Sequence, residues 1–220
     1  MRRYIMFKES HITSKKIADY RITASQLNAF DWFLHNEKDN AEQELISTIN
    51  RDSVGHTEPQ DKGKSFEFVI NLCLKDDNII TQIIEHSVES VIVDFSSKEH
   101  TFRFKFDAEI IVKMYDLLKH QRVHSQQVFI NKYITLQSEK RVELYGYVDY
   151  LTPLTVIDLK TTGNYNFPKY ITNWQTYVYG YILADRISSV DFIATDFKNV
   201  FHEIYNIEHV NYIISFKDLQ

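Results

Sequence analysis

The change in hydrophobic pattern along the chain limits what it can fold into more than any other feature. On the N-terminal side, apolar side chains recur mainly at helical spacing, most clearly over 107–119, where Ile110, Ile111 and Met114 share one side. From Val128 onward, short segments rich in β-branched and aromatic residues alternate with polar breaks, which is typical of strands. Helices followed by three strands, one helix and two further strands predict an α/β or α+β fold.

The same patterns place the individual elements. We expect helices from Ser25 and over 40–50, 64–74, 107–119 and 168–183, and strands over 128–130, 144–151, 155–159, 190–197 and 200–207. Residues 51–63 are expected to form a loop, and the pattern over 78–106 fits either a helix or short strands. With no repeat and no domain boundary, we expect one domain over 1–220, with a helical part over about 1–125 and a sheet core over about 126–220.

Composition excludes several classes of protein. A net charge of −5 excludes a uniformly basic nucleic-acid wrapper but leaves room for a local basic groove. The single cysteine, Cys73, excludes a disulfide framework and an iron–sulfur cluster held by several thiolates of this chain. Since no apolar run reaches the ~20 residues of a membrane span, and residues 1–10 lack a signal-peptide core, we expect a cytoplasmic protein without a membrane partner. ATP use is not implied, because no Gly-x-x-x-x-Gly-Lys-Ser/Thr loop is present.

Three ionisable residues on two predicted strands point to chemistry. Asp158 and Lys160 are two residues apart on a largely apolar strand, so they project from the same side. Asp149 ends the preceding strand, and a tight connection could bring it beside Asp158. Two converging carboxylates repel each other unless a cation lies between them, and Mg²⁺ favours such oxygen ligands. An ordinary surface ion pair between Asp158 and Lys160 is the alternative.

These residues also form a pattern that resembles a known family. Gly146-Tyr147-Val148-Asp149, then Val156-Ile157-Asp158-Leu159-Lys160-Thr161-Thr162, then Gln175-x-x-x-Tyr179 are similar to the RecB-type branch of the PD-(D/E)xK nuclease superfamily. Gln175 and Tyr179 are four residues apart on a predicted helix and therefore share one face. No proline precedes Asp149, so the Pro-Asp pair that gives the superfamily its name is absent, as it often is in this branch.

The resemblance extends upstream with a substitution. The family's Ser-x-Leu-x-x-Phe helix is matched by Ser25 to Phe30, and its Gly-x-x-x-His helix by Gly63 to Glu67, where glutamate replaces histidine. Glutamate is known at this position in phage-type exonucleases, and its oxygens suit Mg²⁺. A solvated helix residue is the alternative reading of Glu67.

The resemblance implies a fold, a site and a cofactor. The fold would be a restriction-endonuclease-like α/β core, with a mixed central sheet flanked by helices. Mg²⁺, replaceable by Mn²⁺, would be held by Glu67, Asp149, Asp158 and the backbone carbonyl of Leu159. Lys160 would act in catalysis together with these carboxylates, and Gln175 and Tyr179 would position the Lys160 strand or the substrate.

The implied function is metal-dependent hydrolysis of DNA, by a cluster-free exonuclease of recombination, repair or phage replication in a bacterial or phage-infected cell. DNA is the expected partner, and a single-strand annealing or recombination protein and a homo-oligomer are further partners that such an enzyme would suit. The alternatives are a non-catalytic DNA-binding or interaction module on the same fold, and a restriction-type endonuclease.

Overall fold

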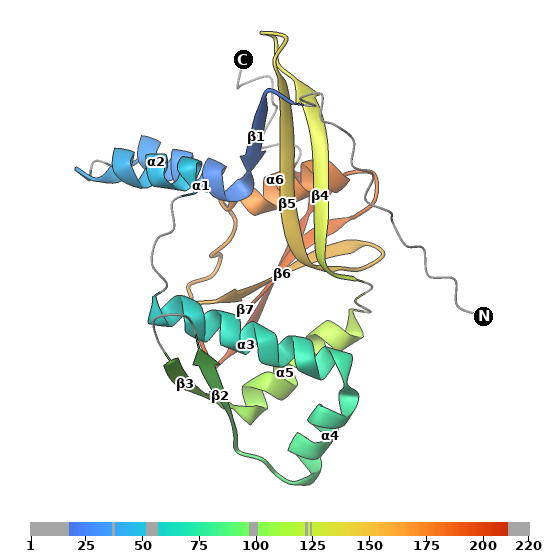
Figure 1. The fold of residues 1–220 in the computed structure, drawn as a ribbon. Coiled ribbons are helices and arrows are strands. Elements are labelled where there is room, and N and C mark those ends of the chain that lie inside the picture. Colours follow the sequence, from blue (N-terminus) through green and yellow to red (C-terminus); the bar gives the residue numbers. More distant parts are fainter. Residues whose placement is uncertain are drawn as a thin grey trace, which may run out of the picture.

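The computed structural model describes residues 18–36, 38–51, 57–96, 101–121, 123 and 125–210. In chain order its elements are β1 (Tyr20–Thr23), α1 (Ala24–Leu34), α2 (Ala41–Asn50), α3 (Glu58–Lys75), α4 (Asp77–Glu85), β2 (Ser90–Ser96), β3 (Thr101–Asp107), α5 (Ala108–His120), β4 (Ser125–Thr135), β5 (Arg141–Leu151), β6 (Thr155–Thr161), α6 (Trp174–Leu183), β7 (Ser189–Thr195), β8 (Val200–Asn206) and α7 (Ile207–Val210). The chain is therefore α/β, as expected (Figure 1).

Six of the described strands form one mixed sheet. Its order is β1-β5-β6-β7-β8, and β4 pairs with the other edge of β5 as a long antiparallel hairpin. β5 and β6 are antiparallel, whereas the crossover through α6 makes β7 parallel to β6. β2 and β3 form a separate two-stranded sheet. A mixed central sheet flanked by helices is thus confirmed.

One edge of β5 is shared by two strands with a gap between them. β1 pairs with β5 only from Val142 to Tyr145, and β6 pairs only with Tyr150 and Leu151. Within the described strands, the four residues from Gly146 to Asp149 therefore have no strand partner on this edge. Because this stretch is the Gly-x-x-Asp motif, the motif lies at an opening in the sheet.

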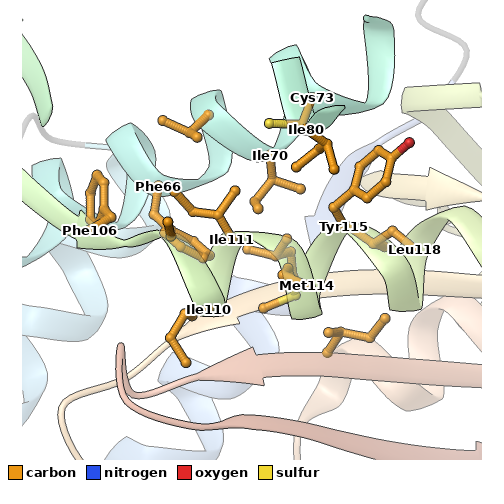
Figure 2. Packing of buried hydrophobic residues seen from close by; sticks show 14 of the residues in the cluster. Phe66, Ile70, Cys73, Ile80, Phe106, Ile110, Ile111, Met114, Tyr115 and Leu118 are labelled. Atoms are coloured by element: carbon orange, nitrogen blue, oxygen red, sulfur yellow. The ribbon is translucent and has the colours of Figure 1, made fainter. Parts of the chain in front are cut away.

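Helices cover the two faces of the sheet with separate apolar clusters. On one face, α3 and α5 pack on β6 and β8, and Phe66, Ile70, Ile111 and Met114 are fully buried (Figure 2). On the other face, α6 packs on β4, β5 and β7, burying residues such as Val178. Cys73 is buried within the first cluster (Figure 2).

Several boundaries differ from those expected. The expected loop over 51–63 ends early, because Pro59 and the Gln60 side chain, which accepts a hydrogen bond from Thr57 N–H, start α3 at Glu58. The rest of that loop, over 52–56, lies outside the described residues. At the first expected helix, Thr23 rather than Ser25 caps α1.

The start of one further helix differs from the expectation. The helix expected over 168–183 begins only at Trp174, because the Lys169 and Tyr170 N–H groups donate to the Glu203 carboxylate instead of starting a helical ladder. Within the part expected to be mainly helical, about 1–125, the ambiguous stretch over 78–106 contains most of α4 and both β2 and β3, and β1 is a further short strand before α1. Among the described residues, no helix is both long and apolar enough to span a membrane.

Candidate active site

The two aspartates face each other where β5 and β6 separate. Regular pairing ends at Tyr150 opposite Ile157, and one further step of that register places Asp149 opposite Asp158. At this step a side chain replaces the backbone ladder, since Asp149 Oδ2 accepts a hydrogen bond of 2.9 Å from Leu159 N–H. The sheet opening is therefore held in part by the carboxylate itself.

Asp158 is the most enclosed of the acidic residues at this opening. It is 2% exposed, Lys160 Nζ lies 2.5 Å from its Oδ2, and Gln175 Nε2 donates to its Oδ1 at 2.7 Å. The expected alternation is confirmed, because Asp158 and Lys160 meet on one side while Ile157 and Leu159 pack in the α3–α5 cluster. The pair lies in the sheet rather than on the exposed surface, unlike an ordinary surface ion pair.

Two side chains of α6, Gln175 and Tyr179, contact β5 and β6 at the opening. Gln175 Nε2 also lies 3.0 Å from the Tyr179 hydroxyl, which donates to the Tyr147 carbonyl at 3.1 Å, so both residues of the Gln-x-x-x-Tyr motif face β5 and β6. The glycine of the other motif explains how α6 comes so close. A Cβ on Gly146 would lie 2.8 Å from Tyr179 Cε1, a distance that no packed side chain tolerates.

Glu67 reaches the same region from α3. Gln127 Nε2 lies within 3.2 Å of Glu67 Oε1 and 3.3 Å of Asp149 Oδ1, so one amide links the two carboxylates. α3 lies close to β6 here, because a Cβ on Gly63 would be 2.5 Å from Thr161 Oγ1. The structure thus brings Glu67 to the aspartates rather than leaving it as a solvated helix residue.

Gln127 and Asn71 also belong to this cluster, and the sequence did not single them out. Gln127 lies opposite Asp149 in the β4–β5 register but outside the regular ladder, with a left-handed φ of 53° that is uncommon for a residue other than glycine. Asn71 accepts a hydrogen bond of 2.9 Å from the Tyr150 hydroxyl and hydrogen-bonds Glu67. Neither residue stands in a motif, and their roles depend on contacts between distant strands and helices, so no local signal identifies them.

The electrostatics of the cluster disfavour three negative charges together. Burial, followed by repulsion from Asp158, raises the pKa of Asp149 to about 7. Burial also raises the pKa of Asp158, against the opposing effects of Lys160 and Gln175. The pKa of Glu67 is raised by burial and then by the charge of Asp158. A positive charge in addition to that of Lys160 would relieve this repulsion further.

The donor chemistry fits a divalent cation. Among the described residues, no three His, Cys, Asp or Glu side chains form a ready-made metal-binding group. Glu67, Asp149 and Asp158 nevertheless act on one another electrostatically, and carboxylate oxygens are the ligands that Mg²⁺ prefers. The carbonyl of Leu159 points to the same strand edge as its N–H, which meets Asp149, so it also lies on the side of the opening.

A pocket of about 420 Å³ adjoins the cluster. Its lining includes Glu67 and Lys160 together with Gln60, Lys64 and Thr161. This volume lies within the range of small-ligand sites in proteins. A second pocket, of about 430 Å³ between α1 and the segment before α6, contains none of the predicted site residues.

Comparisons with known proteins leave the family open. No family model matches the chain, and no curated protein is similar to it. Among solved structures, one described as "Crystal structure of SSO0001" is 11% identical with a TM-score of 0.37, covering 96% of this chain and 79% of that one. A similarity this distant carries no argument about fold or function.

Proposed function

We propose that this protein is a divalent-metal-dependent deoxyribonuclease that acts as an exonuclease. Its fold would be a restriction-endonuclease-like core. The observation that carries the proposal is the meeting of Asp149, Asp158 and Glu67 with Lys160 at an opening in the sheet. Asp149, Asp158 and Lys160 come from the consecutive strands β5 and β6, whereas Glu67 comes from α3, which is distant in the sequence, so its arrival at the aspartates follows from the fold and not from a short motif. Buried groups with strongly perturbed pKa values beside a pocket are typical of catalytic sites.

Each residue has a role that its contacts support. Asp149, Asp158, Glu67 and the Leu159 carbonyl would hold the ion. When bound, a divalent ion lowers the pKa of a coordinated water and polarises a phosphate oxygen. Lys160, a compact ammonium held by Asp158 and facing the pocket, would stabilise the charge that develops on the phosphate oxygens in the transition state.

Gln175 and Tyr179 act as positioning residues. Gln175 fixes one Asp158 oxygen by donating a hydrogen bond to it, and the Tyr179 hydroxyl donates to the backbone carbonyl of Tyr147. Gln127 plays a similar part between Glu67 and Asp149. Such supporting contacts orient ligands and commonly change metal affinity or activity 10–100-fold when removed.

Digestion of three DNA substrates tests the proposal. End-labelled linear duplex, single-stranded and closed circular DNA are incubated with Mg²⁺ or Mn²⁺, and with EDTA as the control. Loss of linear DNA while the circles survive supports an exonuclease. Nicking or linearisation of the circles would instead indicate an endonuclease. No cleavage of any substrate would leave the non-catalytic binding module as the better account.

A further inference from the structure

The outer face of the β4–β5 hairpin carries exposed aromatic side chains. Phe129 on β4 and Tyr147 on β5 are cross-strand partners whose ring centroids lie 5.3 Å apart, and they are 43% and 59% exposed. Tyr145, which is itself buried, adjoins Phe129 on the same face, with 6.0 Å between the ring centroids. α6 packs on the opposite face, through Gly146, so this helix does not cover the aromatic rings. Figure 1 shows the hairpin extending well beyond β6 and β7, with β1 beside its upper part.

This aromatic face is continuous with the candidate active site. Side chains alternate along a strand, so Tyr145 and Tyr147 project from one side of β5, and Asp149 follows two residues after Tyr147. Across the hairpin, Phe129 pairs with Tyr147, and Gln127, two residues before Phe129 and outside the regular ladder, donates to both Asp149 and Glu67. A ligand lying along the hairpin would therefore reach the carboxylates directly.

Cations are present along the same path. The Arg21 guanidinium lies 4.4 Å from the Tyr145 ring centroid, and Arg51, at the end of α2, lies 5.7 Å from it and donates to the Tyr145 hydroxyl. Arg21 is shared with the Glu143 carboxylate, whereas Arg51 is exposed. At the other end of the path, Lys160 lines the pocket. Guanidinium and ammonium groups at both ends suit a chain of phosphates.

We propose that this hairpin face binds an unpaired strand of nucleic acid, with bases stacked on Tyr147 and Phe129 and phosphates near Arg51 and Lys160. This inference rests on the proposed nuclease function and specifies its substrate as single-stranded at the point of entry. Bases in a duplex are stacked on each other, so only an unpaired strand can offer base faces to these rings. Exposed cross-strand aromatic pairs can also simply stabilise a hairpin. Binding measurements with ring-removing variants separate the two.

Binding is measured by fluorescence anisotropy with a labelled oligothymidylate, with Ca²⁺ in place of Mg²⁺. Tyr147→Ala and Phe129→Ala are expected to weaken binding by on the order of ten- to a hundredfold each, whereas Tyr147→Phe, which keeps the ring, stays within about threefold of wild type. Ile92→Ala is the matched control, because Ile92 on β2 is 59% exposed, as Tyr147 is. An abasic oligomer of equal length should bind wild type more weakly and be indifferent to Tyr147→Ala.

The inference is overturned if folded Tyr147→Ala and Phe129→Ala bind oligothymidylate as tightly as wild type, or if sensitivity to Tyr147→Ala persists with the abasic strand. A Tyr147→Ala variant that only loses self-association or melting temperature also overturns it. If wild type cleaves DNA and the aromatic variants bind as tightly as wild type, the proposed binding face is wrong while the proposed nuclease function stands. If binding depends on the rings but no substrate is cleaved, the binding face stands and the proposed nuclease function is wrong. Absence of both cleavage and binding removes both.

Discussion

The Asp149 carboxylate accepts a hydrogen bond from the backbone N–H of Leu159 at the position where the β5–β6 pairing ends, so a side chain takes the place of a strand partner. Asp149 is thereby fixed beside Asp158 at the price of a raised pKa, since burial and a neighbouring negative charge both disfavour its ionised form. The Leu159 carbonyl lies on the side of the same opening, and Gln127 from β4 donates to Asp149 there.

Metal binding should stabilise the folded protein, and Asp158→Asn should remove the effect. At an ion concentration about 100 times the dissociation constant the gain is roughly 2.7 kcal/mol, or a rise in Tm of about 5–10 °C for a chain of this size. Mn²⁺ should act at lower concentration than Mg²⁺. Because the fold favours the neutral form of Asp158, metal-free Asp158→Asn should melt at or above wild type.

Thermal melts with and without millimolar Mn²⁺ check this prediction. Asp94→Asn, which alters an exposed ion pair on β2, serves as the control and should keep the full shift. An unchanged Mn²⁺ shift in Asp158→Asn would remove Asp158 from the ligand set. Glu67→Gln tests the third carboxylate in the same way.

The metal-free protein should lose stability as the pH rises from about 4 to 7. The folded-state pKa of Asp149, about 7, lies above the unfolded value of about 3.9, so the folded state holds a proton that the unfolded state has released. The stabilisation is complete below the unfolded pKa and is lost as pH passes through the folded one. Melts in EDTA from pH 4 to 8 measure it, and Asp149→Asn should flatten the profile. Identical profiles for variant and wild type would contradict the assignment.

Gly63→Ala should destabilise the protein, and Thr161→Ala should rescue it. The new Cβ would lie 2.5 Å from Thr161 Oγ1, and overpacking of this kind costs about 1–3 kcal/mol. Removing Oγ1 leaves Thr161 Cβ at 3.7 Å, an ordinary contact. Denaturant unfolding of the two single variants and the double variant measures the coupling free energy. If the changes in unfolding free energy of the two single variants simply add in the double variant, contact with the Thr161 hydroxyl is not the reason that residue 63 must be glycine.

Gln175→Ala should lower activity more than it lowers stability. The amide holds Asp158 Oδ1 and contacts Tyr179, so its loss should reduce activity or metal affinity by about 10–100-fold. A metal titration of activity should show half-maximal activity at a higher ion concentration. Tyr179→Phe keeps the ring against Gly146 but loses the bond to the Tyr147 carbonyl, so it should show a smaller effect. A lower Tm with unchanged activity per folded molecule would make Gln175 only a packing residue.

Local patterns predicted the elements that carry the candidate site. Period-two alternation put Asp158 and Lys160 on one side of a strand, and the four-residue spacing put Gln175 and Tyr179 on one helix face, as the structure has them. The meeting of Asp149 with Asp158 was also foreseeable, because only a short turn separates their strands.

What the sequence could not predict depends on tertiary contacts. Gln127 joins the site through a left-handed backbone on a strand 22 residues away from Asp149, and nothing in its neighbours marks it. The late start of α6 depends on Glu203, which holds the backbone of Lys169 and Tyr170 from a strand that follows them. The gap in the β5 edge exists only because β1 and β6 meet the same edge at different places.

Single-turnover cleavage by Lys160→Ala tests the central claim most directly. End-labelled DNA is mixed with excess enzyme and Mn²⁺, and binding of the same DNA in Ca²⁺ is measured on the same preparation. Lys113→Ala is the control, because Lys113 also forms a 2.5 Å ion pair with a carboxylate, Glu109, but on the exposed face of α5. We expect metal-dependent cleavage by wild type and Lys113→Ala, and none by Lys160→Ala, which should still bind DNA, since an ammonium at the phosphate acts on the transition state. Cleavage by Lys160→Ala at the wild-type rate, or wild-type cleavage that persists in EDTA, would contradict the account.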